Sequence, residues 1–225
     1  MKLHSVFAAV LAVAGVTSAQ AMVDVDLGAY TVSYDQTTPG FGFLAGSFNG
    51  GGGSTGFNWN VSPSVLVASS GALETAIFAM PAFTISVNPG WVLSGPVTGF
   101  LGNLVFNEFM GGATTATTAG SVSVDSGGAF ATGGALDRVA SLAGPLTTGY
   151  YAGTASAPIG GFSTFSFTGG TLTLTASGPA FASVVSQPQN QLRISLVATP
   201  VPEPETAALM LAGLLTLVSL ARRRS

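Results

Sequence analysis

Few residues in this chain have side chains suited to acid–base, nucleophilic or metal chemistry. The sequence has no cysteine and one histidine, His4, close to its N-terminus. Without cysteine, thiolate nucleophiles, thiolate metal sites and disulfides are excluded. The chain beyond this N-terminal segment has no histidine. It therefore lacks the imidazole on which Ser-His-Asp triads and histidine-ligated zinc depend. We therefore predict that the protein is not an enzyme and binds no cofactor.

The carboxylates offer one candidate metal site. Asp24 and Asp26 are two residues apart, so on a strand their side chains share one face. Calcium prefers carboxylate and carbonyl oxygens, and the pair would supply half of a calcium site. Solvated residues on a strand face are the alternative. A hydrolase that uses two carboxylates is a less favoured alternative, because the other acids are scattered and Asp137-Arg138 is interpreted as a surface feature.

The aromatic residues offer a second kind of site. Trp59, Trp91 and the Tyr150-Tyr151 pair have flat rings of the kind that stack on sugars. A carbohydrate-binding module is therefore an alternative function, and it requires Trp59 or Trp91 on an exposed face or groove. The competing interpretation places these rings in the core, where most aromatic residues of an all-β domain pack.

A serine in a glycine-rich segment matches the sequence motif of a catalytic nucleophile but not its expected surroundings. Gly52–Gly56 reads G-x-S-x-G with Ser54 at its centre. A real nucleophile elbow lies between a strand and a helix and needs a base. Here more glycine precedes it and Phe57-Asn58-Trp59-Asn60 follows. We interpret the segment as the loop of a hairpin.

The composition limits the class of partner. Only 7% of the residues are charged, against about 25% in a typical domain. Between Met22 and Thr199, seven acids and two bases give a net charge of −5. Nucleic acid is excluded as a partner, because phosphate binding needs clustered Lys and Arg.

The pattern of the body, residues 22–198, predicts strands. Alternation of apolar and polar residues recurs at Val23–Asp35, Phe83–Val87, Asn103–Phe109 and Gln191–Ala198, and this is the period of a half-buried strand. Gly and Pro turn signals recur every 8–12 residues, as in antiparallel sandwiches. We predict one all-β domain, an antiparallel β-sandwich or jelly-roll-like fold.

Two local predictions are more specific. In Phe165–Leu174, apolar residues alternate around Gly169-Gly170, which predicts a hairpin with the glycines as its two-residue turn. Phe165, Phe167, Leu172 and Leu174 would then share one face. Short helices are also predicted within Ser69–Met80 and Gly134–Leu142. The stretch Gly111–Gly120 is interpreted as a long loop or an edge strand, and Thr199–Pro204 as a linker.

The N-terminus has the three parts of a secretory signal peptide. Lys2 and His4 form a basic start, Ser5–Val16 is apolar, and Ala19-Gln20-Ala21 is a small-x-small cleavage site. A buried N-terminal helix is the alternative. We predict that residues 1–21 are a signal helix removed on export, with cleavage after Ala21.

The C-terminus, residues 199–225, combines a proline step, an apolar run and a basic end. Pro202-Glu203-Pro204 comes first, Thr206–Ala221 is uncharged and mostly apolar, and Arg222, Arg223 and Arg224 follow. As a helix, the apolar run would be about 24 Å long, somewhat short of the roughly 30 Å hydrocarbon core. It is predicted to be a transmembrane helix, held by arginines that stay cytoplasmic.

Two other interpretations of this segment are less favoured. A buried core helix would not end in three adjacent charges, and a glycolipid-anchor signal normally ends apolar. The ordered combination instead resembles the PEP-CTERM sorting domain of Gram-negative bacteria, over about the last twenty-five residues.

That resemblance implies a partner enzyme. Proteins with this tail are thought to be recognised by exosortase, a multi-pass membrane transpeptidase, and cut near the Pro-Glu-Pro step. They are then released or attached at the cell surface, often in bacteria that make exopolysaccharide and biofilm. The expected protein is thus exported, passes through an inner-membrane intermediate, and ends at the cell surface or outside the cell. Polysaccharide is a further expected partner.

Overall fold

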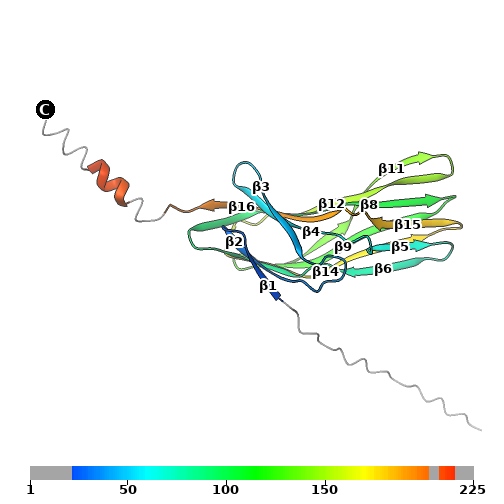
Figure 1. The fold of residues 1–225 in the computed structure, drawn as a ribbon, viewed down its shortest axis with the longest axis horizontal. Coiled ribbons are helices and arrows are strands. Elements are labelled where there is room, and N and C mark those ends of the chain that lie inside the picture. The colour runs from blue at the N-terminus through cyan, green and yellow to red at the C-terminus, as the bar shows by residue number, and fades with distance from the viewer. Residues whose placement is uncertain (1–21, 203–207, 216–225) are drawn as a thin grey trace, which may run out of the picture.

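The computed structural model describes residues 22–202 and 208–215, and most of them lie in antiparallel strands (Figure 1). The all-β prediction is confirmed. Residues 208–215 form one short helix. The strands form two sheets that share a core, so the fold is sandwich-like.

The first sheet has seven strands in the order β1-β2-β7-β14-β9-β10, with β6 also paired to β14. Its strands are β1 (Met22–Asp26), β2 (Tyr30–Asp35), β6 (Glu74–Ala79), β7 (Phe83–Val87), β9 (Ala113–Val124), β10 (Gly128–Ala135) and β14 (Thr164–Ser177).

The second sheet has nine strands in the order β11-β12-β8-β16-β4-β3, with β13 and β15 also paired to β8, and β5 paired to β15. Its strands are β3 (Leu44–Asn49), β4 (Ser54–Asn60), β5 (Leu66–Ser69), β8 (Trp91–Phe109), β11 (Asp137–Ala143), β12 (Leu146–Ala157), β13 (Gly161–Phe162), β15 (Phe181–Ser186) and β16 (Gln191–Pro200).

The predicted hairpin around Gly169-Gly170 is wrong. β14 runs continuously from Thr164 to Ser177, and the glycines form a bulge at which the register with β9 shifts between Thr168 and Thr171. β7 and β6 pair with the two halves of β14, and Met80 N donates to Gly170 O at 2.8 Å. A bulge lets a strand bend without reversing, and β9 on one side, with β7 and β6 in succession on the other, keeps the strand extended.

The alternation within that stretch was nevertheless predicted correctly. Phe165, Leu172 and Leu174 are buried in the common core, and Phe167 packs against it. The bulge therefore returns the second half of β14 to the same face as the first. Local alternation reports which face a residue occupies, whereas a turn and a bulge at Gly-Gly have the same local pattern.

The two predicted helices are also wrong. Residues 74–79 are β6, paired with β14, and the second stretch contains the end of β10 and most of β11. Ala and Leu favour helix only weakly, and the backbone hydrogen bonds that these strands make with their neighbours outweigh that preference. Gly111–Gly120, expected to be a loop or an edge strand, lies mostly in β9, which is paired on both sides by β10 and β14.

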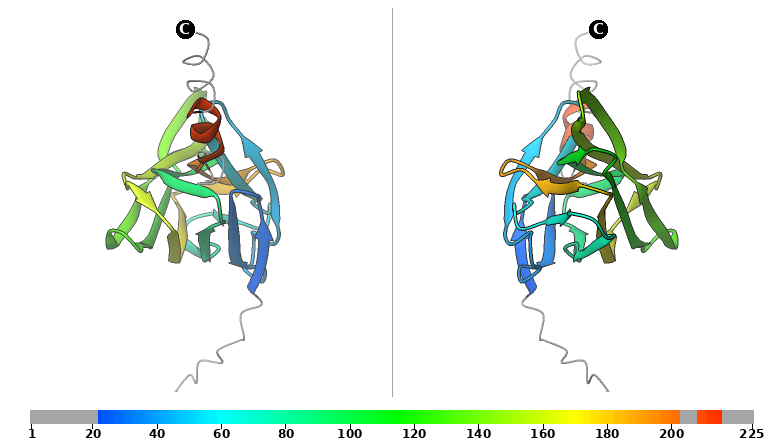
Figure 2. Two further views of the ribbon diagram at one scale, coloured as in Figure 1. Left: turned by 90° about the vertical axis from the view of Figure 1, so that its left-hand side faces the viewer. Right: turned by 90° about the vertical axis from the view of Figure 1, so that its right-hand side faces the viewer.

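A cluster of aromatic rings joins the two inner faces. Tyr34 and Phe83 come from the first sheet, and Phe57 and Trp59 from β4 of the second. The ring centroid of Trp59 lies 5.7 Å from that of Tyr34, 5.5 Å from that of Phe83 and 5.3 Å from that of Phe57. Such pairs contribute about 0.5–1.5 kcal/mol each beyond area burial. Viewed along the long axis, the strands surround this common interior (Figure 2).

Gly56 allows β4 to approach its neighbours closely. A Cβ atom at this position would clash with the backbone oxygen of Ile194 on β16 and with the Phe48 ring on β3. Real Cβ atoms do not come this close to other heavy atoms. The glycine thus sets the spacing of three adjacent strands, and the backbone of Ile194 cannot move without breaking their pairing.

We expect Gly56→Ala to lower the free energy of unfolding by about 2 kcal/mol, because overpacking forces backbone shifts. Gly51→Ala, in the β3–β4 turn, is the matched control, since a Cβ there meets nothing within 4 Å. Urea unfolding of the two variants measures the difference. Equal midpoints for both would contradict the packing argument.

Tyr30 connects the sheets through a polar contact in the core. It is fully buried, and its hydroxyl lies 3.4 Å from Thr55 Oγ1 on β4. Burial raises the pKa of Tyr30 above 10.0, against the opposing effect of the hydrogen bond to Thr55. The folded state therefore holds this proton more tightly than the unfolded chain does. The resulting contribution to stability is complete below pH 10 and is lost as the pH rises through the folded pKa.

We expect Tyr30→Phe to lose less stability than the unmodified protein between pH 9 and pH 11, since phenylalanine has no proton to lose. Urea midpoints measured across this range test the expectation, with Tyr150→Phe, a substitution of an exposed ring, as the control. Parallel pH curves for Tyr30→Phe and the unmodified protein would show that ionisation of Tyr30 is not linked to folding.

Candidate functional site

The C-terminal segment leaves the fold from the inside of the second sheet rather than from its edge. β16 lies between β8 and β4 and ends at Pro200, which pairs with Trp91. Val201 N then donates to Gly90 O at 2.8 Å, and Val201 and Pro202 are exposed. Thr199 and Pro200 are thus part of a strand, which corrects the predicted linker. The Pro-Glu-Pro step begins two residues beyond a strand that is held on both sides.

The helix at 208–215 is apolar and exposed. Its large side chains, Leu209, Met210, Leu211, Leu214 and Leu215, have exposed fractions between 59% and 74%. No helix within residues 22–202 and 208–215 is long and apolar enough to cross a membrane. The predicted helix 206–221 is described only over these eight positions, where it is helical.

Several predicted site residues lie outside the described residues. These are the signal cleavage residues Ala19 and Ala21 and the sorting residues Glu203, Pro204, Arg222, Arg223 and Arg224. Of the predicted sorting motif, only Pro202 is described, and it is exposed.

Neither tryptophan lies on an open face. Trp59 is fully buried in the aromatic cluster, so its predicted role in sugar stacking is wrong. Trp91, at the start of β8, is half-buried and packs against the core. The sequence could not separate these two environments, because buried and sugar-binding tryptophans both occur on strands.

Asp24 and Asp26 share the exposed face of β1, as predicted. Their oxygens serve local structure. Asp24 Oδ1 accepts a hydrogen bond from Ser33 Oγ at 2.5 Å, and Asp26 Oδ1 accepts from Gly28 N and Asn88 Nδ2, both at 2.8 Å. Within the described part of the chain, no group of three or more acidic or histidine residues is arranged to hold a metal ion.

Ser54 begins β4 directly after the turn that joins it to β3, and the two strands are antiparallel. The interpretation of Gly52–Gly56 as the loop of a hairpin is correct for Gly52 and Gly53 only, because Ser54–Gly56 belong to β4. No helix follows Ser54, so the nucleophile-elbow geometry is missing.

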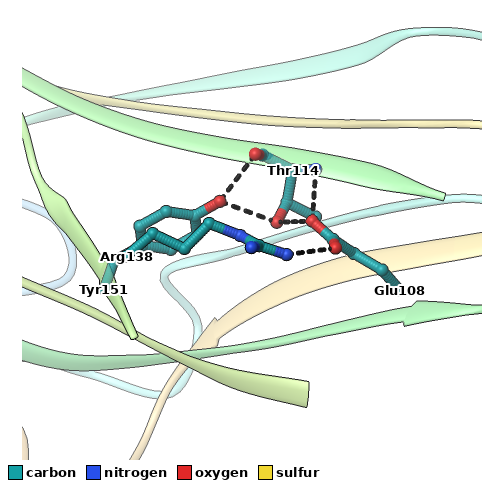
Figure 3. A network of polar contacts seen from close by, with 4 residues as sticks. All are labelled: Glu108, Thr114, Arg138 and Tyr151. Carbon is teal, nitrogen blue, oxygen red and sulfur yellow. Dashed lines mark hydrogen bonds and ion pairs between the residues drawn. The ribbon is translucent and has the colours of Figure 1, made fainter. Parts of the chain in front are cut away.

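A buried carboxylate, Glu108, organises a polar network that the sequence did not reveal (Figure 3). Its Oε1 accepts from Thr114 N at 2.8 Å and from Thr114 Oγ1 at 2.7 Å, and its Oε2 accepts from Arg138 Nη2 at 2.5 Å. Tyr151 OH donates to Thr114 O at 2.6 Å. Both carboxylate oxygens therefore face donors of this chain rather than a cleft.

Arg138 is exposed, as expected of a surface feature, but it also takes part in this network. Its guanidinium lies 4.5 Å from the centre of the Phe106 ring and pairs with Glu108. The partners come from β8, β9, β11 and β12 and are separated by up to 43 positions, from Glu108 to Tyr151. The pairing of β8 and β11 with β12 brings Arg138 and Tyr151 near Glu108, and the turn between β8 and β9 adds Thr114, so no local pattern in the sequence indicates the network.

Asp125 shows the same use of a carboxylate at another turn. Its two oxygens accept from Ser163 N at 3.2 and 3.0 Å. Desolvation acts to raise the pKa of Asp125, but hydrogen bonds with Thr164, Ser163 and Ser126 together lower it below 3.8. The carboxylate is held in its charged form, which suits an acceptor that fixes a loop and not a general acid.

Comparison with known proteins adds no relative. No protein-family model matches the chain, and no curated protein matches it significantly.

We expect Glu108→Ala to lower the free energy of unfolding by about 3 kcal/mol, because it leaves two buried donors of Thr114 without an acceptor and breaks the ion pair. Arg138→Met should cost less, about 1 kcal/mol, since Glu108 keeps the donors of Thr114. Glu74→Ala, at an exposed position, should change stability by less than about 0.5 kcal/mol.

Urea unfolding at neutral pH measures all three variants. If Glu108→Ala were no less stable than Glu74→Ala, the network would not be a structural element of the fold.

Proposed function

We propose that this chain is an exported, non-catalytic protein of the cell surface or extracellular matrix, sorted through its C-terminal segment. A signal helix at residues 1–21 directs export. A transmembrane helix at 206–221 then holds the protein at the inner membrane, with Arg222–Arg224 on the cytoplasmic side. An exosortase-type transpeptidase cuts near Pro202-Glu203-Pro204, and the body is delivered to an exopolysaccharide or biofilm matrix.

The observation that carries the proposal is the way the chain leaves its last strand. β16 is paired with β4 up to Val197 and with β8 up to Pro200, Val201 is held by Gly90, and Pro202 is already exposed. Prolines lack an N–H and disfavour helix and strand pairing, so a protease-accessible extended segment would start directly outside the folded body. A rigid body joined to a short accessible segment suits a processing enzyme that recognises the tail and ignores the domain.

The exposure of the helix at 208–215 adds support to the proposal. Five large apolar side chains that remain exposed are costly in water, at about 25 cal/mol per Å² of apolar surface. Every residue of this helix is exposed, which argues against a buried terminal helix of the domain. A lipid environment would remove that cost.

The acids of the body support a role without catalysis. Glu108 accepts from Thr114 and Arg138, and Asp125 accepts from Ser163. Each is used to hold a turn or neighbouring strands. A carboxylate-only hydrolase would instead need two carboxyl groups flanking a substrate.

The sorting step is tested in a Gram-negative bacterium that has an exosortase. We expect intact-mass analysis of the surface or secreted protein to give a product without residues 1–21 and without Arg222–Arg224. Replacing Pro202, Glu203 and Pro204 by alanine should leave a membrane-bound form that keeps the arginines.

Pro158→Ala is the matched control, because this proline is exposed in the β12–β13 connection and lies outside the tail. It should be processed like the unmodified protein. A mature protein that keeps Arg222–Arg224 would overturn the processing step and leave a tail-anchored surface protein.

A further inference from the structure

A cavity of about 420 Å³ lies between the two sheets and is partly open to the surface. It is bounded by β9 and β10 of the first sheet and by β8 and β12 of the second. Pockets that hold small molecules have volumes of about 300–1,000 Å³ and are mostly apolar. The size of this cavity falls within that range.

The cavity exists because interior positions carry very small residues. On β8, Gly99 lies between the buried residues Val97 and Leu101, and on β12, Gly153 and Ala155 precede the buried Ala157. A Cβ atom added at Gly99 would meet Ile194 Cδ1 at 3.6 Å, which is ordinary contact. Crowding does not require glycine at this position, so the space is left open by residue choice.

Large apolar side chains form the floor of the cavity. Phe83, Phe165, Leu192 and Ile194 line it and are all buried. At another side lies Leu136, where the chain passes from β10 in the first sheet to β11 in the second, and Leu136 N donates to Ala116 O at 2.9 Å. This crossover fixes the separation of the sheets beside the cavity.

The shape follows from the packing of sheets. Packed sheets lie about 10 Å apart, and Gly or Ala side chains fill little of that distance. Small residues on the inner face of the second sheet, such as Gly99 and Ala155, leave a slot that is narrow between the sheets and extended along them. An aliphatic chain fits such a slot, whereas a bulky globular ligand does not.

Charge selects the head group of the ligand. Among the residues that line the cavity, Asp137 is the one with an ionisable side chain, and no lysine, arginine or histidine lines it. Arg138, next in sequence, is paired with Glu108. An anionic head group would find no cation and would be repelled by the acidic body.

We propose that this cavity binds a neutral aliphatic molecule, an alkyl chain with an uncharged polar head. The chain lies between the sheets, and Thr118 and Thr132, two half-buried residues of the lining, supply hydroxyl groups for the head. This inference concerns the body and is independent of the proposed sorting of the tail.

The experiment uses the full chain without detergent and the neutral fluorescent probe N-phenyl-1-naphthylamine. Dodecanol and dodecanoate then compete for the bound probe at neutral pH. We expect dodecanol to displace it and dodecanoate to require at least a tenfold higher concentration. Two variants, Ala155→Phe and Gly99→Leu, fill the slot from adjacent strands and should each weaken probe binding at least tenfold.

Ala129→Phe is the control, since Ala129 on β10 is exposed and does not line the cavity. It should bind the probe like the unmodified protein, and this comparison removes any binding to the exposed helix at 208–215. Circular dichroism and urea midpoints identify a variant that fails to fold, in which case the other filling variant decides. Unchanged binding in a folded filling variant, or equal competition by dodecanoate, would overturn the proposal.

Discussion

The contact between the inner faces of the two sheets is the interaction on which the rest of this structure depends. The chain has no cysteine for a disulfide, so no covalent cross-link reinforces the packing of the sheets. Trp59 and Phe57 from one sheet and Tyr34 and Phe83 from the other are large buried side chains in contact, at ring-centroid distances between 5.3 and 5.7 Å. Close contact there sets the separation of the sheets, and that separation in turn defines the cavity farther along the interior.

Glycine has two opposite uses in this interior. At Gly56 it permits an approach that a methyl group would prevent, whereas at Gly99 a methyl group would have room. The first glycine allows three strands of one sheet to lie close together, and the second leaves space between the two sheets. Composition alone, with 31 glycines, cannot distinguish these uses, because the difference depends on what lies opposite each residue.

The few charged side chains serve mainly to stabilise turns and connections between strands. Glu108 and Asp125 each hold a connection between strands, and Asp26 holds the β1–β2 turn through Gly28. With so few charged groups, a carboxylate engaged in this way is not available to a substrate. The structural use of these carboxylates agrees with the proposal of a non-catalytic protein that is sorted to the cell surface and binds a molecule between its sheets.

The sequence by itself determined the secondary-structure class, the alternation of faces and the character of the tail. These properties are local, since a two-residue period or a proline step is visible within a short window. The bulge at Gly169-Gly170, the strand at 74–79, the burial of Trp59 and the Glu108–Arg138 pair were decided only by the tertiary structure. Each depends on a partner far away in the sequence, because hydrogen bonds and packing between strands are non-local.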